Sequence, residues 1–278
     1  MGAIDFHTHA FPDDLAPRAI ARLQAAADWR AVSGGTVGEL LRSMDECGLD
    51  VSLICTIATK PKQVDGIFAW CREIRSPRIV PLPSVHPADT SPREWINRFA
   101  GEGFPGIKLH PMYQQAAADD EAMMPLYEAA AEAGLFVVVH CGRDAAYPPE
   151  DDRASPRRFR RVIDKLPGLK LICTHMGGWR DWDMAEKHLL ATEVYLETSF
   201  AMAELGPQRA ADMIVRHGTD RVLMGSDWPW QSQAQAAGLI RGLPLTDEQK
   251  QRILRGNAAD LLGLPSANDE FRNMNSET

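Results

Sequence analysis

The chain has 278 residues, of which 45% are hydrophobic, enough to bury a large core, and a formal net charge of −8. This acidic balance, with no basic block to offset it, argues against nucleic acid and anionic membranes as partners. No apolar run reaches the ~18 residues that a membrane span needs, and the first residues lack the basic and apolar regions of a secretory signal.

The predicted elements begin with a strand at residues 3–9, and seven similar apolar stretches follow. Several are almost continuously apolar, such as Phe136-Val137-Val138-Val139, which is typical of parallel strands buried on both faces. Helical periodicity appears between the strands, at residues 36–47, 120–133, 156–165 and 207–217. The later strands are predicted at residues 51–58, 79–85, 106–110, 136–141, 170–175, 194–199 and 221–226.

Strands that alternate with helices eight times indicate the α/β class and a (β/α)8 TIM barrel. Thr246 can cap a closing helix at residues 246–262, with Gln249 three residues on. We therefore expect a single barrel over residues 1–264 and a polar C-terminal tail at 265–278. Residues 144–152 contain two prolines and no apolar period, which predicts a loop above the fifth strand, where barrel enzymes bind substrate.

Candidate metal ligands fall at the ends of the predicted strands. His7 and His9 are two apart on the first strand and share a face, so both imidazoles can reach one ion. Taken alone, they could equally be hydrogen-bonded strand-end histidines. His140 ends the fifth strand, His175 ends the sixth, and Asp227 follows the eighth, so a barrel brings all five to one mouth. Nitrogen and oxygen ligands without thiolate suit zinc or a similar divalent ion.

Five motifs carry a resemblance to a known family. They are His-Thr-His at 7–9, Gly-Ile-Lys-Leu-His-Pro at 106–111, Val-Val-His-Cys-Gly at 138–142, Thr-His-Met-Gly-Gly at 174–178 and Gly-Ser-Asp-Trp-Pro at 225–229. In this order they resemble the amidohydrolase superfamily, and more narrowly its amidohydrolase-2 branch of TIM-barrel metal-dependent hydrolases. That branch also holds aminocarboxymuconate semialdehyde decarboxylase. The resemblance runs from His7 to about Leu264.

The resemblance implies a role for each ligand candidate. His7, His9, His140 and Asp227 would bind one divalent ion, with zinc expected. Asp227 would also take a proton from the metal-bound water. His175 would either complete a second metal site or act beside that water as an acid or base.

Lys108 on the fourth strand leaves the number of ions open. In two-metal relatives a lysine at this place is carbamylated and bridges the ions. In the one-metal branch it stays a cation that can meet a substrate carboxylate. The resemblance favours one ion. A lysine paired with a core carboxylate is the structural alternative.

Other side chains are weaker candidates for substrate contacts. His110 could line the mouth near Lys108 or simply occupy a turn. Trp179 and Trp228 could wall a pocket for a flat substrate or pack within their loops. Arg143 could recognise an acidic substrate or be a surface charge.

The site predicts hydrolysis of an amide, ester or lactone bond in a small molecule, with metal-activated water as the nucleophile. The alternative is a lyase, the non-oxidative decarboxylation of an unsaturated or aromatic carboxylic acid at the same site. A non-catalytic barrel that binds a ligand is a third reading. A homodimer is allowed by the sequence. The scattered cysteines, odd in number and without a C-x-x-C pair, are typical of reduced thiols and favour a cytoplasmic location.

Overall fold

The computed structural model describes residues 2–265 and contains eight parallel strands. Each strand pairs with the next along the chain, within one group of three strands and one of five. The strands are β1 (Ala3–Thr8), β2 (Leu49–Cys55), β3 (Ile79–Leu82), β4 (Gly106–Leu109), β5 (Phe136–Val139), β6 (Leu171–Cys173), β7 (Tyr195–Glu197) and β8 (Val222–Leu223).

Two backbone hydrogen bonds join these groups into a closed barrel. Lys108 N donates to Pro83 O at 3.0 Å between β4 and the end of β3, and Phe6 N donates to Met224 O at 2.8 Å between β1 and the end of β8. The predicted (β/α)8 TIM barrel is therefore confirmed. Among residues 2–265 we find no helix long and apolar enough to cross a bilayer.

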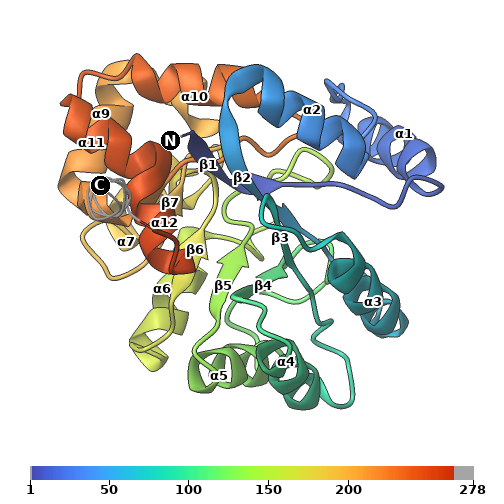
Figure 1. The fold of residues 1–278 in the computed structure, drawn as a ribbon. Helices are drawn as coiled ribbons and strands as arrows, with labels where there is room; N and C mark the ends of the chain where they lie inside the picture. The colour runs from blue at the N-terminus through green and yellow to red at the C-terminus, as the bar shows by residue number, and fades with distance from the viewer. Residues whose placement is uncertain (1, 266–278) are drawn as a thin grey trace, which may run out of the picture.

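Helices surround the strands (Figure 1). The predicted helices at 156–165 and 207–217 have the bounds of α6 and α9, and the closing helix contains a π-helical turn, Arg252–Gly256, between α11 and α12. The helices are α1 (Ala16–Ala27), α2 (Val37–Cys47), α3 (Val64–Ile74), α4 (Pro92–Gly101), α5 (Met124–Glu132), α6 (Pro156–Lys165), α7 (Trp182–His188), α8 (Ala201–Leu205), α9 (Pro207–His217), α10 (Gln233–Arg241), α11 (Asp247–Gln251) and α12 (Asn257–Leu262).

Helix α1 is an addition to the strand–helix alternation. It precedes α2 in the connection from β1 to β2, and in Figure 1 it lies at the edge of the molecule beside α2. A capping box at Thr36 and Glu39 starts α2, the helix that the sequence predicts there. The predicted tail at 265–278 lies outside the described residues except for Pro265.

The core explains why the strands read as continuous apolar runs. Val138 belongs to an inner cluster with Phe6 and Phe136, whose rings lie 5.3 Å apart, whereas Val137 and Val139 pack in the outer cluster beneath the helices. Lys108 pairs with Val138 across β4 and β5 and is 1% exposed. Both faces of such a strand are buried, and burying a lysine ammonium group is unfavourable unless polar groups contact it. Lys108 must therefore have polar partners inside the barrel.

Each of the eight strands ends one to three residues earlier than predicted, so His9, His110, His140 and His175 lie just after strands instead of within them. Asp227, predicted to follow the eighth strand directly, lies four residues beyond the end of β8. The register of β1 on β2 also shifts between Asp5 and Thr8. This irregularity lets Phe6 pack in the inner cluster while the adjacent His7 reaches the cavity. His175 and Asp227 have φ angles of 58° and 59°, a left-handed conformation that is uncommon outside glycine and is often found at functional sites.

Candidate metal centre and active site

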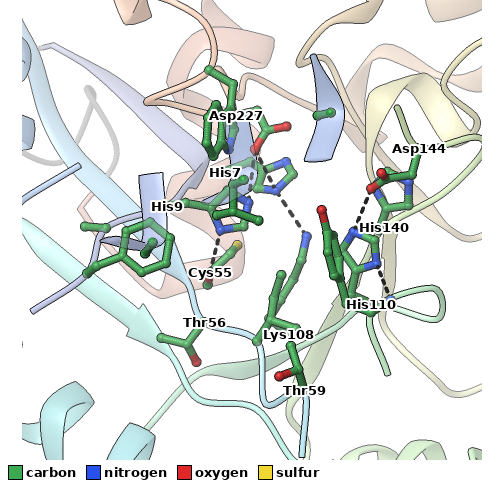
Figure 2. A pocket seen from close by; sticks show the side chains of 18 of the residues that line it. His7, His9, Cys55, Thr56, Thr59, Lys108, His110, His140, Asp144 and Asp227 are labelled. Atoms are coloured by element: carbon green, nitrogen blue, oxygen red, sulfur yellow. Dashed lines mark hydrogen bonds and ion pairs between the residues drawn. The ribbon is translucent and has the colours of Figure 1, made fainter. Parts of the chain in front are cut away.

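Three acceptor atoms converge at the mouth of the barrel (Figure 2). Asp227 Oδ1 lies 3.0 Å from His9 Nε2 and 3.5 Å from His7 Nε2. One ligand atom from each of these residues lies within 4.8 Å of the others. His7 comes from β1, His9 from the residue just past it, and Asp227 from the segment after β8, whose backbone N donates to His7 O at 2.7 Å.

The hydrogen bonds of the two histidines fix which ring nitrogens carry the protons. His7 Nδ1 faces Glu197 Oε2 at 2.9 Å, and His9 Nδ1 faces the Cys55 carbonyl oxygen at 2.7 Å. Both partners are acceptors, so both Nδ1 atoms must be donors and both Nε2 atoms carry lone pairs.

The donor set therefore fits a divalent cation. Two imidazole lone pairs and one carboxylate oxygen point at one space, and Asp227 Oδ1 is a buried atom without a hydrogen-bond partner in the described chain. Such an arrangement is repulsive unless a cation or a proton lies between the acceptors. Neutral histidine nitrogens and a carboxylate are ligands that zinc and manganese accept.

Lys108 lies beside this acceptor set. Its Nζ is 3.1 Å from His7 Nε2, the same lone pair that points toward Asp227. Figure 2 shows the lysine rising from β4 toward the two histidines. A cation that took the His7 lone pair would leave the buried Nζ in need of another acceptor.

His140 and His175 form a second convergence of ring nitrogens. His140 Nε2 donates to Arg143 O at 2.9 Å, and His175 Nδ1 contacts Ser199 O at 3.2 Å and Ser199 Oγ at 2.9 Å. With these protons placed, the lone pairs of His140 Nδ1 and His175 Nε2 face each other at 3.2 Å. The structure thus brings His175 next to His140, and it places His140 outside the three-residue cluster of His7, His9 and Asp227.

Burial keeps these imidazoles in the neutral form that binds metals. It lowers the pKa of His7, His110 and His140 well below the usual value, and that of His175 to about 4. Protonated imidazoles would have no lone pair to donate.

Glu197 is a functional candidate that the sequence analysis missed. It ends β7, is fully buried, and holds His7 Nδ1 while also accepting from Ser199 Oγ at 2.8 Å and the His175 backbone N at 3.4 Å. Burial raises its pKa. A carboxylate on the far nitrogen of a ligating histidine fixes the tautomer and ring orientation. The signal was a lone acid inside the apolar stretch at 194–199.

Asp5 was missed for the same reason. It is fully buried in β1 and accepts hydrogen bonds from Ser226 Oγ at 2.5 Å, Ser226 N at 3.0 Å and Gln233 Nε2 at 2.8 Å. Burial raises its pKa to about 7. These bonds join β1 to the segment that carries Asp227, so Asp5 helps to position the candidate metal ligands.

The acceptor set lies in a cavity of about 540 Å³ whose lining is mainly apolar. His110 lines it, stacked on His140 with ring centroids 4.2 Å apart and with Nε2 3.4 Å from Asp144 Oδ2. Asp144 and Ala145 belong to the segment 144–152, which contains neither helix nor strand. Trp179 also lines the cavity, where it meets Phe200.

Two predicted substrate contacts do not reach this cavity. The Arg143 side chain is exposed, and its carbonyl oxygen, not its guanidinium, meets the site through His140. Trp228 is 1% exposed and packs in the core because it points away from the side that Asp227 faces. Trp230, two residues further on, lines the cavity instead. The backbone turns after the strands set the directions in which the side chains of Arg143, Trp228 and Trp230 point. The spacing of residues along a strand therefore does not predict them.

The fold and the site define a metal-dependent enzyme of the TIM-barrel type. A family model described as Amidohydrolase matches residues 4–264, and the chain belongs to this family. The curated relatives include gamma-resorcylate decarboxylase of Polaromonas sp. (strain JS666), 27% identical over 120 residues, and that of Rhodococcus jostii (strain RHA1), 25% identical over 120 residues. The first match spans 37% of this chain and 37% of the relative, and the second spans 37% and 36%.

Solved structures of similar fold cover nearly the whole chain. One is 5-carboxyvanillate decarboxylase from Sphingomonas paucimobilis, with a TM-score of 0.71, 18% identity, and coverage of 95% of this chain and 99% of that chain. Another is dihydroxybenzoic acid decarboxylase from Polaromonas sp. JS666 with bound manganese and the inhibitor 2-nitroresorcinol. Its TM-score is 0.69, its identity 17%, and the coverage 96% and 98%.

These comparisons correct the predicted activity. The curated relatives are decarboxylases, which break a C–C bond, so the expected hydrolysis of an amide, ester or lactone is wrong. The alternative, non-oxidative decarboxylation, is the activity that they favour. The error has a chemical reason: both reactions use the same metal ligands, so a ligand pattern cannot separate them.

Proposed function

We propose that this protein is a metal-dependent, non-oxidative decarboxylase of an unsaturated or aromatic carboxylic acid. The observation that carries the proposal is the position of Lys108 Nζ, 3.1 Å from one of three convergent metal-ligand atoms at the polar end of a mainly apolar cavity. The likeness to gamma-resorcylate decarboxylases supports the reaction class.

We propose one divalent ion per chain, held by His7, His9 and Asp227. His140 would complete the set of four ligands, although its ring lies outside that three-residue cluster. Zinc and manganese both suit this donor set, and manganese is bound in a similar structure. When bound, the ion would supply positive charge that attracts the oxygens of the substrate. Lys108 stays unmodified in this proposal and donates to the substrate carboxylate after losing His7 as an acceptor.

The surroundings suit the loss of CO2. A carboxylate carries a full charge and CO2 carries none, so the apolar walls that exclude water favour the product side of C–C cleavage. The electron pair of the broken bond stays on the substrate carbon, which then takes up a proton. Asp227 and His175 are the groups that would hold that proton. Asp227 belongs to the acceptor set, the centroid of the His175 ring lies 5.4 Å from that of His7, and both side chains line the cavity.

An assay of two substrate panels tests the proposal. Metal-loaded protein is offered hydroxylated aromatic acids and, separately, aromatic amides, esters and lactones. We expect CO2 and the matching phenol from the acids. Absence of CO2 from every acid, with metal content confirmed, would overturn the proposed activity.

A further inference from the structure

The cavity continues well beyond the metal ligands, between two helices. Its lining includes Leu15, just before α1, and three residues of that helix, Ala19, Leu23 and Ala27. These four positions are spaced by four residues, so they form one stripe along the helix. Gly66, Ile67 and Trp70 of α3 also line the cavity. We call this part of the cavity the apolar groove.

The charges of the cavity lie at its other end. Among the described lining residues, the lysine, aspartate and histidine side chains are those of the metal-binding and neighbouring strand-end segments. Lys108 contacts His7, Asp227 contacts His9, and Asp144 contacts His110. The polar groups that line the cavity from the segment between β2 and α3 are uncharged: Thr56, Thr59 and Gln63. The lining can therefore bind a charged group at the strand ends and an apolar group between α1 and α3.

The volume of the cavity is larger than a single-ring substrate needs. A buried apolar cavity of ~150 Å³ accommodates one benzene ring. The cavity of about 540 Å³ is more than three times as large. A single-ring acid held by Lys108 and the metal ligands would leave the apolar groove filled with water against apolar side chains, which is unfavourable.

We propose that the substrate is an acid with two unlike ends. Its unsaturated or aromatic carboxylate end reaches Lys108 and the metal ligands, and its other end is an uncharged alkyl or aryl extension that lies between α1 and α3. The assignment of the reacting end rests on the proposed decarboxylase function. The apolar character of the other end rests on the groove alone.

A homologous series of acids tests this inference. CO2 release from 2,6-dihydroxybenzoate is compared with that from its para-ethyl, para-butyl and para-hexyl derivatives. Each buried methylene should raise kcat/KM by about threefold to fourfold. A flat or falling series, with CO2 still released from the parent acid, would overturn the extension and leave the decarboxylase function intact.

Binding of para-hexylbenzoate and benzoate, measured by calorimetry, separates this inference from the reaction. Neither acid has the hydroxyl groups that activate the ring, so both report affinity alone. We expect the hexyl compound to bind at least about tenfold more tightly. If this preference appears while no acid releases CO2, the proposed reaction fails and the apolar groove remains a ligand site. Equal affinity overturns the inference.

Two variants fill the groove without altering the metal ligands. A Cβ at Gly66 would meet nothing within 4 Å, so Gly66→Leu should fold, and Ala19→Phe adds a ring on the stripe of α1. Both should abolish the hexyl preference and retain activity on the parent acid. The matched controls are Gly238→Leu, exposed on α10 where a Cβ also meets nothing, and Ala21→Phe, exposed on α1. The inference would be overturned if the control variants lost the hexyl preference to the same extent. It would also be overturned if Ala19→Phe changed the oligomeric state and left the hexyl preference intact.

Discussion

Different parts of the chain build the apolar groove and the other end of the cavity, which holds the candidate metal ligands His7, His9 and Asp227 and which we call the metal-binding end. The strand ends and the segments that follow them supply His7, His9, Lys108 and Asp227, whose directions depend on barrel closure. The groove is lined by α1, which is inserted before the regular helix α2, and by one face of α3. A barrel can keep its chemistry at the strand ends while the connecting segments change the substrate.

The two regions also differ in how much the structure constrains them. The two histidines of β1 and its end are held by buried partners, His7 by Glu197 and His9 by the Cys55 carbonyl. The groove residues contribute apolar surface and are partly exposed. Substitutions at the metal-binding end should therefore abolish catalysis for all acids, whereas substitutions in the groove should change the preference among them.

The largest expected effect comes from Asp227→Asn. The variant loses one anionic ligand and a proton carrier, so CO2 release should fall by about 10³-fold or more on every acid, together with metal content. Activity assays and metal analysis on the same sample measure both. Asp212→Asn, exposed on α9, is the matched control. Retained activity in Asp227→Asn would contradict its placement in the site.

Lys108→Met should raise KM on the order of tenfold to a hundredfold, because a charge-assisted hydrogen bond to the substrate is worth ~1.5–3 kcal/mol. The metal content should remain at one ion per chain. A fall from two ions to one would show instead that Lys108 is a carbamylated bridge. Lys170→Met removes an exposed lysine just before β6 and should leave both values unchanged.

Glu197→Gln should weaken metal binding by roughly tenfold to a hundredfold, the usual cost of removing a carboxylate from a ligating histidine. The amide keeps the size of the side chain but provides only one acceptor for His7 Nδ1 and Ser199. Competition with a fluorescent chelator measures the affinity without any substrate. Glu193→Gln, exposed before β7 and paired with Arg221, is the control. Equal affinities in the two variants would mean that Glu197 does not orient His7.

The sequence predicts the metal-binding end better than the groove because the two depend on different information. Barrel strands all end at one mouth, so His140, His175 and Asp227 could be placed together from strand order alone. The directions of Arg143 and Trp228 could not be, since they follow from local turns after the strands. Glu197 and Asp5 could have been recognised as functional candidates only from the fact that each is an acidic residue inside an apolar stretch.

The sequence of α1 contains a periodic pattern that corresponds to the apolar groove, but its role could not be inferred without the fold. Leu15, Ala19, Leu23 and Ala27 recur every fourth residue, which indicates one apolar face of a helix. That pattern does not say whether the face packs on the barrel or lines a cavity. Only the placement of α1 relative to α3 and the strand ends distinguishes the two.

The smallest expected effect concerns His217, a histidine away from the cavity. It tests whether the loss of folding stability at low pH arises at the metal-binding end or in the outer helices. His217 on α9 is buried, its Nε2 donates to Val194 O at 2.9 Å, and its Nδ1 has no partner in the described chain. Burial lowers its pKa to about 4 from 6.5. The unfolded chain therefore takes up a proton at a higher pH than the folded chain does.

Stability should accordingly fall as the pH drops from about 6.5 to about 4, by roughly 3 kcal/mol from this group. His217→Gln keeps an N–H donor near Nε2 and cannot titrate, so its free energy of unfolding should depend less on pH across this range. Urea unfolding at several pH values, with the pH 8 value as each protein's reference, measures the difference. If the two proteins lose stability in parallel, acid sensitivity must arise in other groups, with the buried imidazoles of the metal-binding end the first to examine.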